Sequence, residues 1–218
     1  MITLHAFGSM FPGGVGETKD MRVQWALEEM GLPYRVRAWD YNGGETDTPE
    51  FTALNPFNQL PLLEDDGLVL AESAAILIHL AETSGRLIPA EAAGRAQVIQ
   101  WCFAAMATVA WPLTAISMVE AGFMGEDPAA RAFLAPLADR WLGALERRLE
   151  GREWLVGDDF TVADLCMAGV LREVRQSDLM DGWPAVRAFH DRAHARPAWR
   201  RTLALYAERL GTTVDAIA

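Results

Sequence analysis

Two short segments, Gln59-Leu60-Pro61 and Glu72-Ser73, contain the residues whose types and spacing best suit a binding site. A proline that opens a strand has no N–H to give to the sheet, so Pro61 is expected at a strand start or a sheet edge. If the Leu60–Pro61 peptide bond is cis, the turn leaves the N–H and C=O of Leu60 available to a group outside the sheet. This backbone pair is the first candidate contact for a ligand.

Glu72-Ser73 stands where a predicted strand gives way to a predicted helix. The first N–H groups of a helix are unpaired, and the helix dipole there favours an anion. Ser73 can add a hydroxyl donor to a bound carboxylate, and Glu72 can accept a hydrogen bond from a bound ammonium group. Together they could hold the α-amino-acid end of a ligand. Taken alone, the pair is more typical of ordinary helix capping, so this interpretation depends on the proline turn before it.

The elements around these segments predict an α/β unit over residues 1–83. Its β-prone runs are Ile2–Phe7, Tyr34–Trp39, Pro61–Glu64 and Leu68–Leu70. Apolar residues at i, i+3, i+4 and i+7 predict a helix ending at Gly31, and a second helical pattern follows Ser73. Asp65-Asp66-Gly67 is a strong hairpin signal between the last two strands. The order β-α-β, a connection and β-β-α is that of a thioredoxin-like unit.

Residues 90–218 show only helical periodicity, after a linker at about 84–89 where glycine and proline interrupt the pattern. One helix is marked by apolar residues between Val98 and Val109. The others are expected at Ala129–Glu150, Thr161–Arg175, Pro184–Arg196 and Pro197–Arg209. The fold class is therefore an α/β N-terminal domain followed by an all-helical C-terminal domain.

In this order and spacing, the segments resemble the glutathione-site pattern of the soluble, bacterial-type glutathione transferases. The resembling stretches are Leu27-Glu28-Glu29, Gly31-Leu32-Pro33-Tyr34, Asn55-Pro56, Gln59-Leu60-Pro61, Asp66-Gly67, Glu72-Ser73-Ala74-Ala75-Ile76 with Leu80, and Leu155-Val156-Gly157 before Thr161-Val162-Ala163-Asp164. In the last of them, a threonine and an acidic residue three apart predict a capping box. The resemblance spans nearly the whole chain and does not assign a class.

The resemblance implies a role for each site residue. Leu60 would pair main chain to main chain with the cysteinyl part of glutathione, and Pro61 would be the cis proline. Gln59 would reach the glycine end, while Glu72 and Ser73 would hold the γ-glutamyl end. Glutathione would be the co-substrate for a small apolar electrophile in a detoxification reaction. The family also implies a homodimer that pairs through the third and fourth helices.

Glutathione chemistry needs one more group, a donor to the thiol. A free thiol has a pKa near 8.5, and lowering it by about two units requires about 2.7 kcal/mol of preferential stabilisation of the thiolate. A hydroxyl donor supplies about 1.5–3 kcal/mol of that. The loop from Gly8 to Lys19 is longer than the family's usual connection and contains two candidates, Ser9 after the first strand and Thr18 at the helix start. Both stay open, as does the alternative that neither acts. The loop glycines match no phosphate-binding loop, because no Gly-Lys-Ser/Thr follows them.

Charge and composition narrow the partners. A net charge of −11 argues against nucleic acid, and the arginines at 192, 196, 200 and 201 are flanked by acidic residues, which favours a solvated helix face. We expect neither a leader peptide nor an apolar stretch long enough for a membrane span. Cys102 and Cys166 are interpreted as buried thiols of a reducing compartment, so the protein is expected to be cytoplasmic. The histidines have no ligand spacing, and no metal is predicted.

The large apolar residues Trp101, Phe103, Met106 and Trp111 have helical spacing, which favours core positions over a co-substrate pocket. The leading functional hypothesis is an enzyme that activates glutathione for conjugation or peroxide reduction. A glutathione-dependent isomerase is less favoured, because the Ser-Ser-Cys stretch of such relatives is missing. A thiol reductase with its own cysteine would need one between residues 8 and 18, where the sequence has none. The alternative from another class is a non-catalytic binding module.

Overall fold

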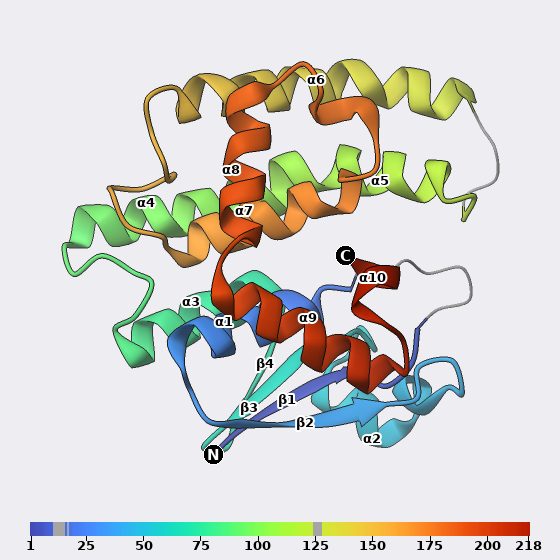
Figure 1. Cartoon of the computed structure of the whole chain (residues 1–218). Coiled ribbons are helices and arrows are strands. Elements are labelled where there is room, and N and C mark those ends of the chain that lie inside the picture. The colour runs from blue at the N-terminus through green and yellow to red at the C-terminus, as the bar shows by residue number, and fades with distance from the viewer. Residues whose placement is uncertain (11–15, 17, 124–127) are drawn as a thin grey trace. The chain divides into compact units, whose positions relative to one another are not determined.

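The computed structural model describes residues 1–10, 16, 18–123 and 128–218. Its ribbon is drawn in Figure 1. The chain divides into two compact units: unit 1 is Met1–Ser84 with Arg196–Ala218, and unit 2 is Gly85–Ala195. These units are not the expected domains, 1–83 and 90–218, because the last helices group with the N-terminal residues. The expected boundaries stay a prediction.

Unit 1 contains a four-stranded mixed sheet in the order β2-β1-β3-β4. The strands are β1 (Ile2–Phe7), β2 (Tyr34–Trp39), β3 (Leu62–Asp65) and β4 (Leu68–Ala71). β1 runs parallel to β2 and antiparallel to β3, and β3 and β4 form a hairpin. Asp66 and Gly67 take φ angles of 47° and 89° at its turn, as an Asp-Gly hairpin requires. The predicted thioredoxin-like fold is confirmed.

The helices of unit 1 are α1 (Asp20–Met30), α2 (Pro49–Leu54), α3 (Ser73–Ser84), α9 (Pro197–Leu210) and α10 (Val214–Ile217). A single 3-10 turn, η1 (Glu45–Asp47), precedes α2. α1 ends at Gly31 with φ 60°, as predicted. α2 was not predicted, although its start carries a local signal: Thr48 caps it by accepting from the Phe51 N–H at 3.3 Å, and Pro49 follows.

α9 packs on α1 through ion pairs, which corrects one expectation about the C-terminal arginines. Arg196 forms two bonds to the Glu29 carboxylate, at 2.8 and 2.9 Å. Arg201 donates to Glu28 Oε2 at 3.0 Å. A merely solvated face was predicted for these arginines because the sequence shows only the acidic residues next to them. Their partners lie on a helix more than 160 residues earlier.

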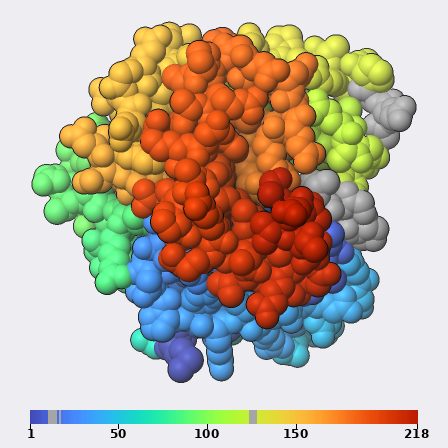
Figure 2. Space-filling model, in the orientation of Figure 1, coloured from blue at the N-terminus to red at the C-terminus, as the bar shows by residue number. Residues whose placement is uncertain are grey.

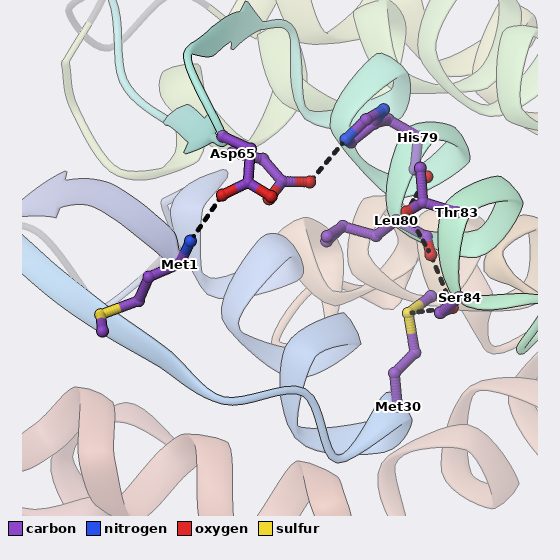
Figure 3. Close-up of polar contacts among 8 residues, drawn as sticks. Met1, Met30, Asp65, His79, Leu80, Thr83 and Ser84 are labelled. Carbon is purple, nitrogen blue, oxygen red and sulfur yellow. Dashed lines mark hydrogen bonds and ion pairs between the residues drawn. The ribbon is translucent and has the colours of Figure 1, made fainter.

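α3, the helix that begins at Ser73, has contacts to other elements from its middle and from its C-terminal end. His79 Nε2 lies 3.0 Å from Asp65 Oδ2 on β3, and the Ser84 hydroxyl lies 3.6 Å from Met30 Sδ on α1 (Figure 3). The N-terminal ammonium of Met1 adds a contact of 2.8 Å to Asp66 in the hairpin turn. The helix is thus tied to the hairpin and to α1.

The described residues of unit 2 form helices and loops and contain no strand. Its elements are α4 (Ala92–Phe103), the π-helical turn η2 (Ala104–Val109), α5 (Ala110–Glu120), α6 (Pro128–Leu149), α7 (Val162–Leu171), the 3-10 turns η3 (Arg172–Val174) and η4 (Asp178–Met180), and α8 (Pro184–His194). Every residue of α7 is buried, and α4, α5 and α8 pack on it. Cys102 and Cys166 are buried free thiols, as predicted.

The apolar run through α4, η2 and α5 departs from two expectations. Phe103 is 66% exposed and Trp111 is 49% exposed, so the core interpretation is wrong for both side chains. Among the described residues, the continuous helical run Ala92–Glu120 is long and apolar enough, by length and composition alone, to cross a membrane. No such run was expected. Within unit 2, this run packs against other helices, because α4 and α5 contact α7 and α5 also contacts α6.

The capping box at the start of α7 is confirmed. Asp164 Oδ2 accepts from the Thr161 N–H at 2.8 Å and from its hydroxyl at 2.9 Å, and Asp164 Oδ1 accepts from the Leu155 N–H at 2.7 Å. Burial raises the pKa of Asp164 to about 6, against the opposing effect of these donors. The carboxylate therefore ties the loop at Leu155 to the central helix.

We expect Asp164→Ala to lower the free energy of unfolding by about 3 kcal/mol, because it leaves buried donors without an acceptor. Chemical denaturation followed by circular dichroism measures the change. Asp159→Ala is the matched control, since Asp159 is a nearby exposed aspartate and its loss should cost within about 0.5 kcal/mol. Equal stabilities of the two variants would contradict the structural role of the box.

Candidate active site

The register of the β3–β4 hairpin joins the two segments that the sequence selects. Leu62 pairs with Ala71, so Pro61 directly precedes one end of this pair and Glu72 directly follows the other. The Leu60–Pro61 turn and the start of α3 therefore lie at the same end of the hairpin. This adjacency makes a single site of two short segments that are eleven residues apart in the chain.

The turn before β3 is stabilised by hydrogen bonds of the Asn55 side chain, which belongs to a residue that is only 3% exposed. Its side-chain Nδ2 donates to the Gln59 carbonyl at 2.9 Å, and its Oδ1 accepts from the Phe57 N–H at 3.1 Å. Gln59 itself is exposed. Sequence reasoning used Asn55 only as part of a pattern. Its readiness to form an Asx turn before a proline was the signal that could have assigned it this structural role.

The Leu60–Pro61 peptide bond is cis. The Leu60 side chain is buried in an apolar cluster with Phe7, Trp39, Phe51 and Leu62. Within the part of the chain that the structure describes, neither the N–H nor the C=O of Leu60 forms a hydrogen bond. A buried side chain thus anchors a backbone unit that has one donor and one acceptor to offer.

The start of α3 offers donors for an anion. The first intrahelical bond runs from the Ile76 N–H to the Glu72 carbonyl at 2.9 Å, so the N–H groups of the three preceding residues have no helical partner. Ser73 is 2% exposed, and its hydroxyl has no hydrogen-bond partner among the described residues. A buried hydroxyl without a partner costs about 1–3 kcal/mol, which a ligand acceptor would relieve.

Glu72 stands beside Ser73 with φ 67°, in the left-handed region that disfavours residues other than glycine. Such a conformation costs about 1 kcal/mol or more and is concentrated at functional sites. Its side chain is exposed. A carboxylate beside an anion-binding helix start suits a ligand group that carries both charges.

Thr18 and Asp20 lie at the start of α1 and contact α9. The Thr18 hydroxyl forms a hydrogen bond with the Tyr206 hydroxyl. Arg209 donates to Asp20 Oδ2 at 2.6 Å, and Asp20 is completely buried. Burial raises the pKa of Asp20, while Arg209 and the Thr18 hydroxyl act to lower it. Sequence reasoning missed Tyr206 and Arg209, because no local pattern links residues that lie about 190 positions apart.

Ser9, the other candidate hydroxyl, follows β1 and is half-buried. Its oxygen accepts a hydrogen bond from the Asn42 side chain at 3.1 Å, and the same amide donates to the Met10 carbonyl at 2.9 Å. A serine that accepts one bond keeps its own proton for another acceptor. The glycine pair at positions 13 and 14 lies outside the described residues.

The described residues contain no group of three or more His, Cys, Asp or Glu side chains that could hold a metal ion. His190 and His194 were expected on separate elements, but both lie on α8 with ring centroids 4.2 Å apart, as residues four apart on one helix do.

Comparison with known proteins decides the family. The model of the glutathione S-transferase N-terminal domain matches residues 13–82, and that of the C-terminal domain matches residues 117–201. The chain belongs to the glutathione S-transferase family. The N-terminal match covers the Leu60 turn and Ser73.

Relatives of this chain differ in their named activities. It is 32% identical to the disulfide-bond oxidoreductase YfcG of Escherichia coli over 84% of this chain and 88% of that one. It is also 32% identical to a glutathione S-transferase of Silene vulgaris over 88% and 95%. A glutathione transferase of Burkholderia graminis, solved with two glutathione molecules per subunit, superposes with a TM-score of 0.80 at 33% identity, covering 92% of this chain and 86% of that chain.

Proposed function

We propose that this protein binds glutathione at the Leu60 turn and the start of α3 and activates its thiol for conjugation to a small apolar electrophile or for peroxide reduction. One observation carries the proposal. The unpaired Leu60 backbone and the buried, unpartnered Ser73 hydroxyl lie at one end of the same hairpin. The glutathione-bound Burkholderia structure supports the choice of ligand.

Each part of the tripeptide has a proposed partner. The cysteinyl main chain pairs with the Leu60 N–H and C=O, next to the cis Pro61. The γ-glutamyl carboxylate accepts from Ser73 and the N–H groups of α3, and the ammonium contacts Glu72. Gln59 reaches the glycine end. None of these proposed partners donates to the cysteinyl sulfur, so its hydrogen-bond donor must come from another element.

For the sulfur, we propose a hydroxyl donor, with Thr18 first and Ser9 as the alternative. Thr18 precedes α1, whose first N–H groups and dipole also favour an anion. A hydroxyl that donates to a thiolate contributes about 1.5–3 kcal/mol, equivalent to a fall in thiol pKa of about one to two units.

Glutathione-dependent disulfide reduction is a second candidate, favoured by the name of the E. coli relative. In this reaction two glutathione thiols reduce one disulfide to two thiols, and glutathione disulfide leaves. No cysteine lies between residues 8 and 18, so both reducing sulfurs would come from glutathione. Parallel assays with a chloronitrobenzene, an organic hydroperoxide and a small dialkyl disulfide discriminate the two candidates. A glutathione-dependent isomerase or a non-catalytic module would turn over none of the three.

We expect Ser73→Ala to weaken glutathione binding by about 10-fold or more, because the ligand carboxylate loses a charge-assisted hydrogen bond. Isothermal titration calorimetry measures the affinity. Thr83→Val is the matched control, as it removes an exposed hydroxyl that donates to the His79 carbonyl within the same helix. Unchanged affinity in Ser73→Ala would rule out the proposed binding mode. No binding by the unaltered protein at millimolar glutathione would favour the non-catalytic module.

The thiol donor is tested by the pH dependence of thiolate absorbance in the ultraviolet. Removal of the donor should raise the pKa of the bound thiol by about one to two units, so the thiolate appears at higher pH. Thr18→Val is expected to do this, and Ser9→Ala is expected to leave the pKa unchanged. The reverse result would assign the role to Ser9, and no change in either variant would exclude both.

We also propose a cytoplasmic homodimer that pairs through the third and fourth helices. The exposed Phe103 at the end of α4 supports an apolar contact there. Light scattering should give twice the mass of the chain, and Phe103→Arg should give a monomer. Phe133→Arg, which alters an exposed phenylalanine on α6, should stay dimeric. A monomeric unaltered protein would contradict the proposal.

A further inference from the structure

The C-terminal helices of unit 1 contact three residues that lie at the start of α1 or shortly before it. Gly16 faces Ile217 of α10, Thr18 pairs with Tyr206 of α9, and Asp20 pairs with Arg209. Figure 2 shows the red atoms of these helices lying against the blue atoms of the N-terminal part of the unit. The proposed thiol donor thus rests on residues from the far end of the chain.

The fit at Gly16 leaves no room for a side chain. A Cβ at this position would lie 2.5 Å from Ile217 Cγ2, and the residue has φ 76°. The Gly16 backbone therefore lies in direct contact with Ile217 of α10.

Arg209 ties three elements together from a nearly buried position, with its side chain 9% exposed. It donates to the Phe7 carbonyl at the end of β1 at 3.1 Å, to Gln24 Oε1 on α1 at 2.7 Å, and to Asp20 Oδ2 at 2.6 Å. The guanidinium also balances the negative charge of Asp20, which would otherwise oppose a thiolate near the helix start. Arg209 therefore fixes the position of the α1 start and compensates the negative charge of Asp20 there.

Tyr206 supplies the direct contact to the hydroxyl. Its ring is completely buried, and the Arg209 guanidinium carbon lies 5.0 Å from the ring centroid. A threonine hydroxyl has one proton and two acceptor lone pairs. When the phenol donates to the Thr18 oxygen, the single Thr18 proton is directed to another acceptor. Asp20 is one acceptor within reach, since its Oδ1 has no hydrogen-bond partner among the described residues, and the sulfur of bound glutathione must compete with it for this proton.

We propose that Tyr206 is a positioning residue for thiol activation: its phenol donates to Thr18 Oγ1 and thereby directs the Thr18 proton toward the glutathione sulfur. This inference rests on the proposed function, in which Thr18 is the donor. A donor that itself accepts a hydrogen bond is polarised and becomes stronger. Tyr206 therefore acts on the thiol through Thr18 and makes no contact with glutathione.

The test is Tyr206→Phe, which removes the phenol oxygen and keeps the ring. We expect the pKa of the bound thiol to rise by about 0.5 unit, or about threefold less thiolate below that pKa, with glutathione affinity unchanged at acidic pH, where the thiol is protonated. Thermal unfolding verifies that the variant is folded. Tyr34→Phe is the matched control. It removes another α1-bound phenol, which accepts from Gln24 and donates to Glu28, and should leave the thiol pKa unchanged.

A double-mutant cycle separates the inference from the function on which it rests. In a Thr18→Val background, Tyr206→Phe should have no further effect, and Thr18→Ser should restore the response to Tyr206→Phe. If Thr18→Val raises the thiol pKa but Tyr206→Phe does not, the inference fails and the proposed function stands. If Thr18→Val also has no effect, the Thr18 assignment fails and the inference fails with it.

Discussion

The pairing of Leu62 with Ala71 in the β3–β4 hairpin is the constraint on which the candidate site depends. A shift of one residue in this register would turn the buried face of each strand outward and separate the Leu60 turn from the start of α3. The Asp66-Gly67 turn fixes the register from one end, because both residues adopt the positive φ that a two-residue turn requires. At the other end the backbone of Leu60 and the hydroxyl of Ser73 become neighbours.

The second constraint is the pairing of α1 with α9, which combines an edge-on contact of the Trp25 and Trp199 rings with ion pairs. Arg196, Arg201 and Arg209 each bind an acidic residue of α1. The Arg209–Asp20 pair is buried, and removing one member of such a pair leaves an uncompensated charge at a cost of about 3–5 kcal/mol. A buried pair is weak evidence for stability, but its geometry specifies one position. Here it specifies where α1 begins.

The sequence predicted what local patterns encode. The hairpin turn, the Gly31 cap and the Thr161–Asp164 box each depend on residues within a few positions of one another, and the structure has all of them. It could not predict the grouping of α9 with the N-terminal unit, because the partners of its arginines are distant in the chain. The predicted core positions of Phe103 and Trp111 were wrong for a different reason. Helical spacing reports a shared face, and it does not say whether that face meets protein or solvent.

The contrast between local patterns and distant contacts also applies to the proposed binding of glutathione and activation of its thiol. The chain has a net charge of −11, and glutathione is itself an anion, so the overall field of the protein opposes binding. Exposed charges farther than about 8 Å from the ligand are largely screened at physiological salt, so donors in direct contact decide the affinity. In the proposed binding mode, Ser73 and the first N–H groups of α3 are such donors, and sequence spacing was enough to propose them. The orientation of the hydroxyl proton at Thr18 depends on the hydrogen-bond partner of that hydroxyl, which is the buried Tyr206 from the other end of the chain.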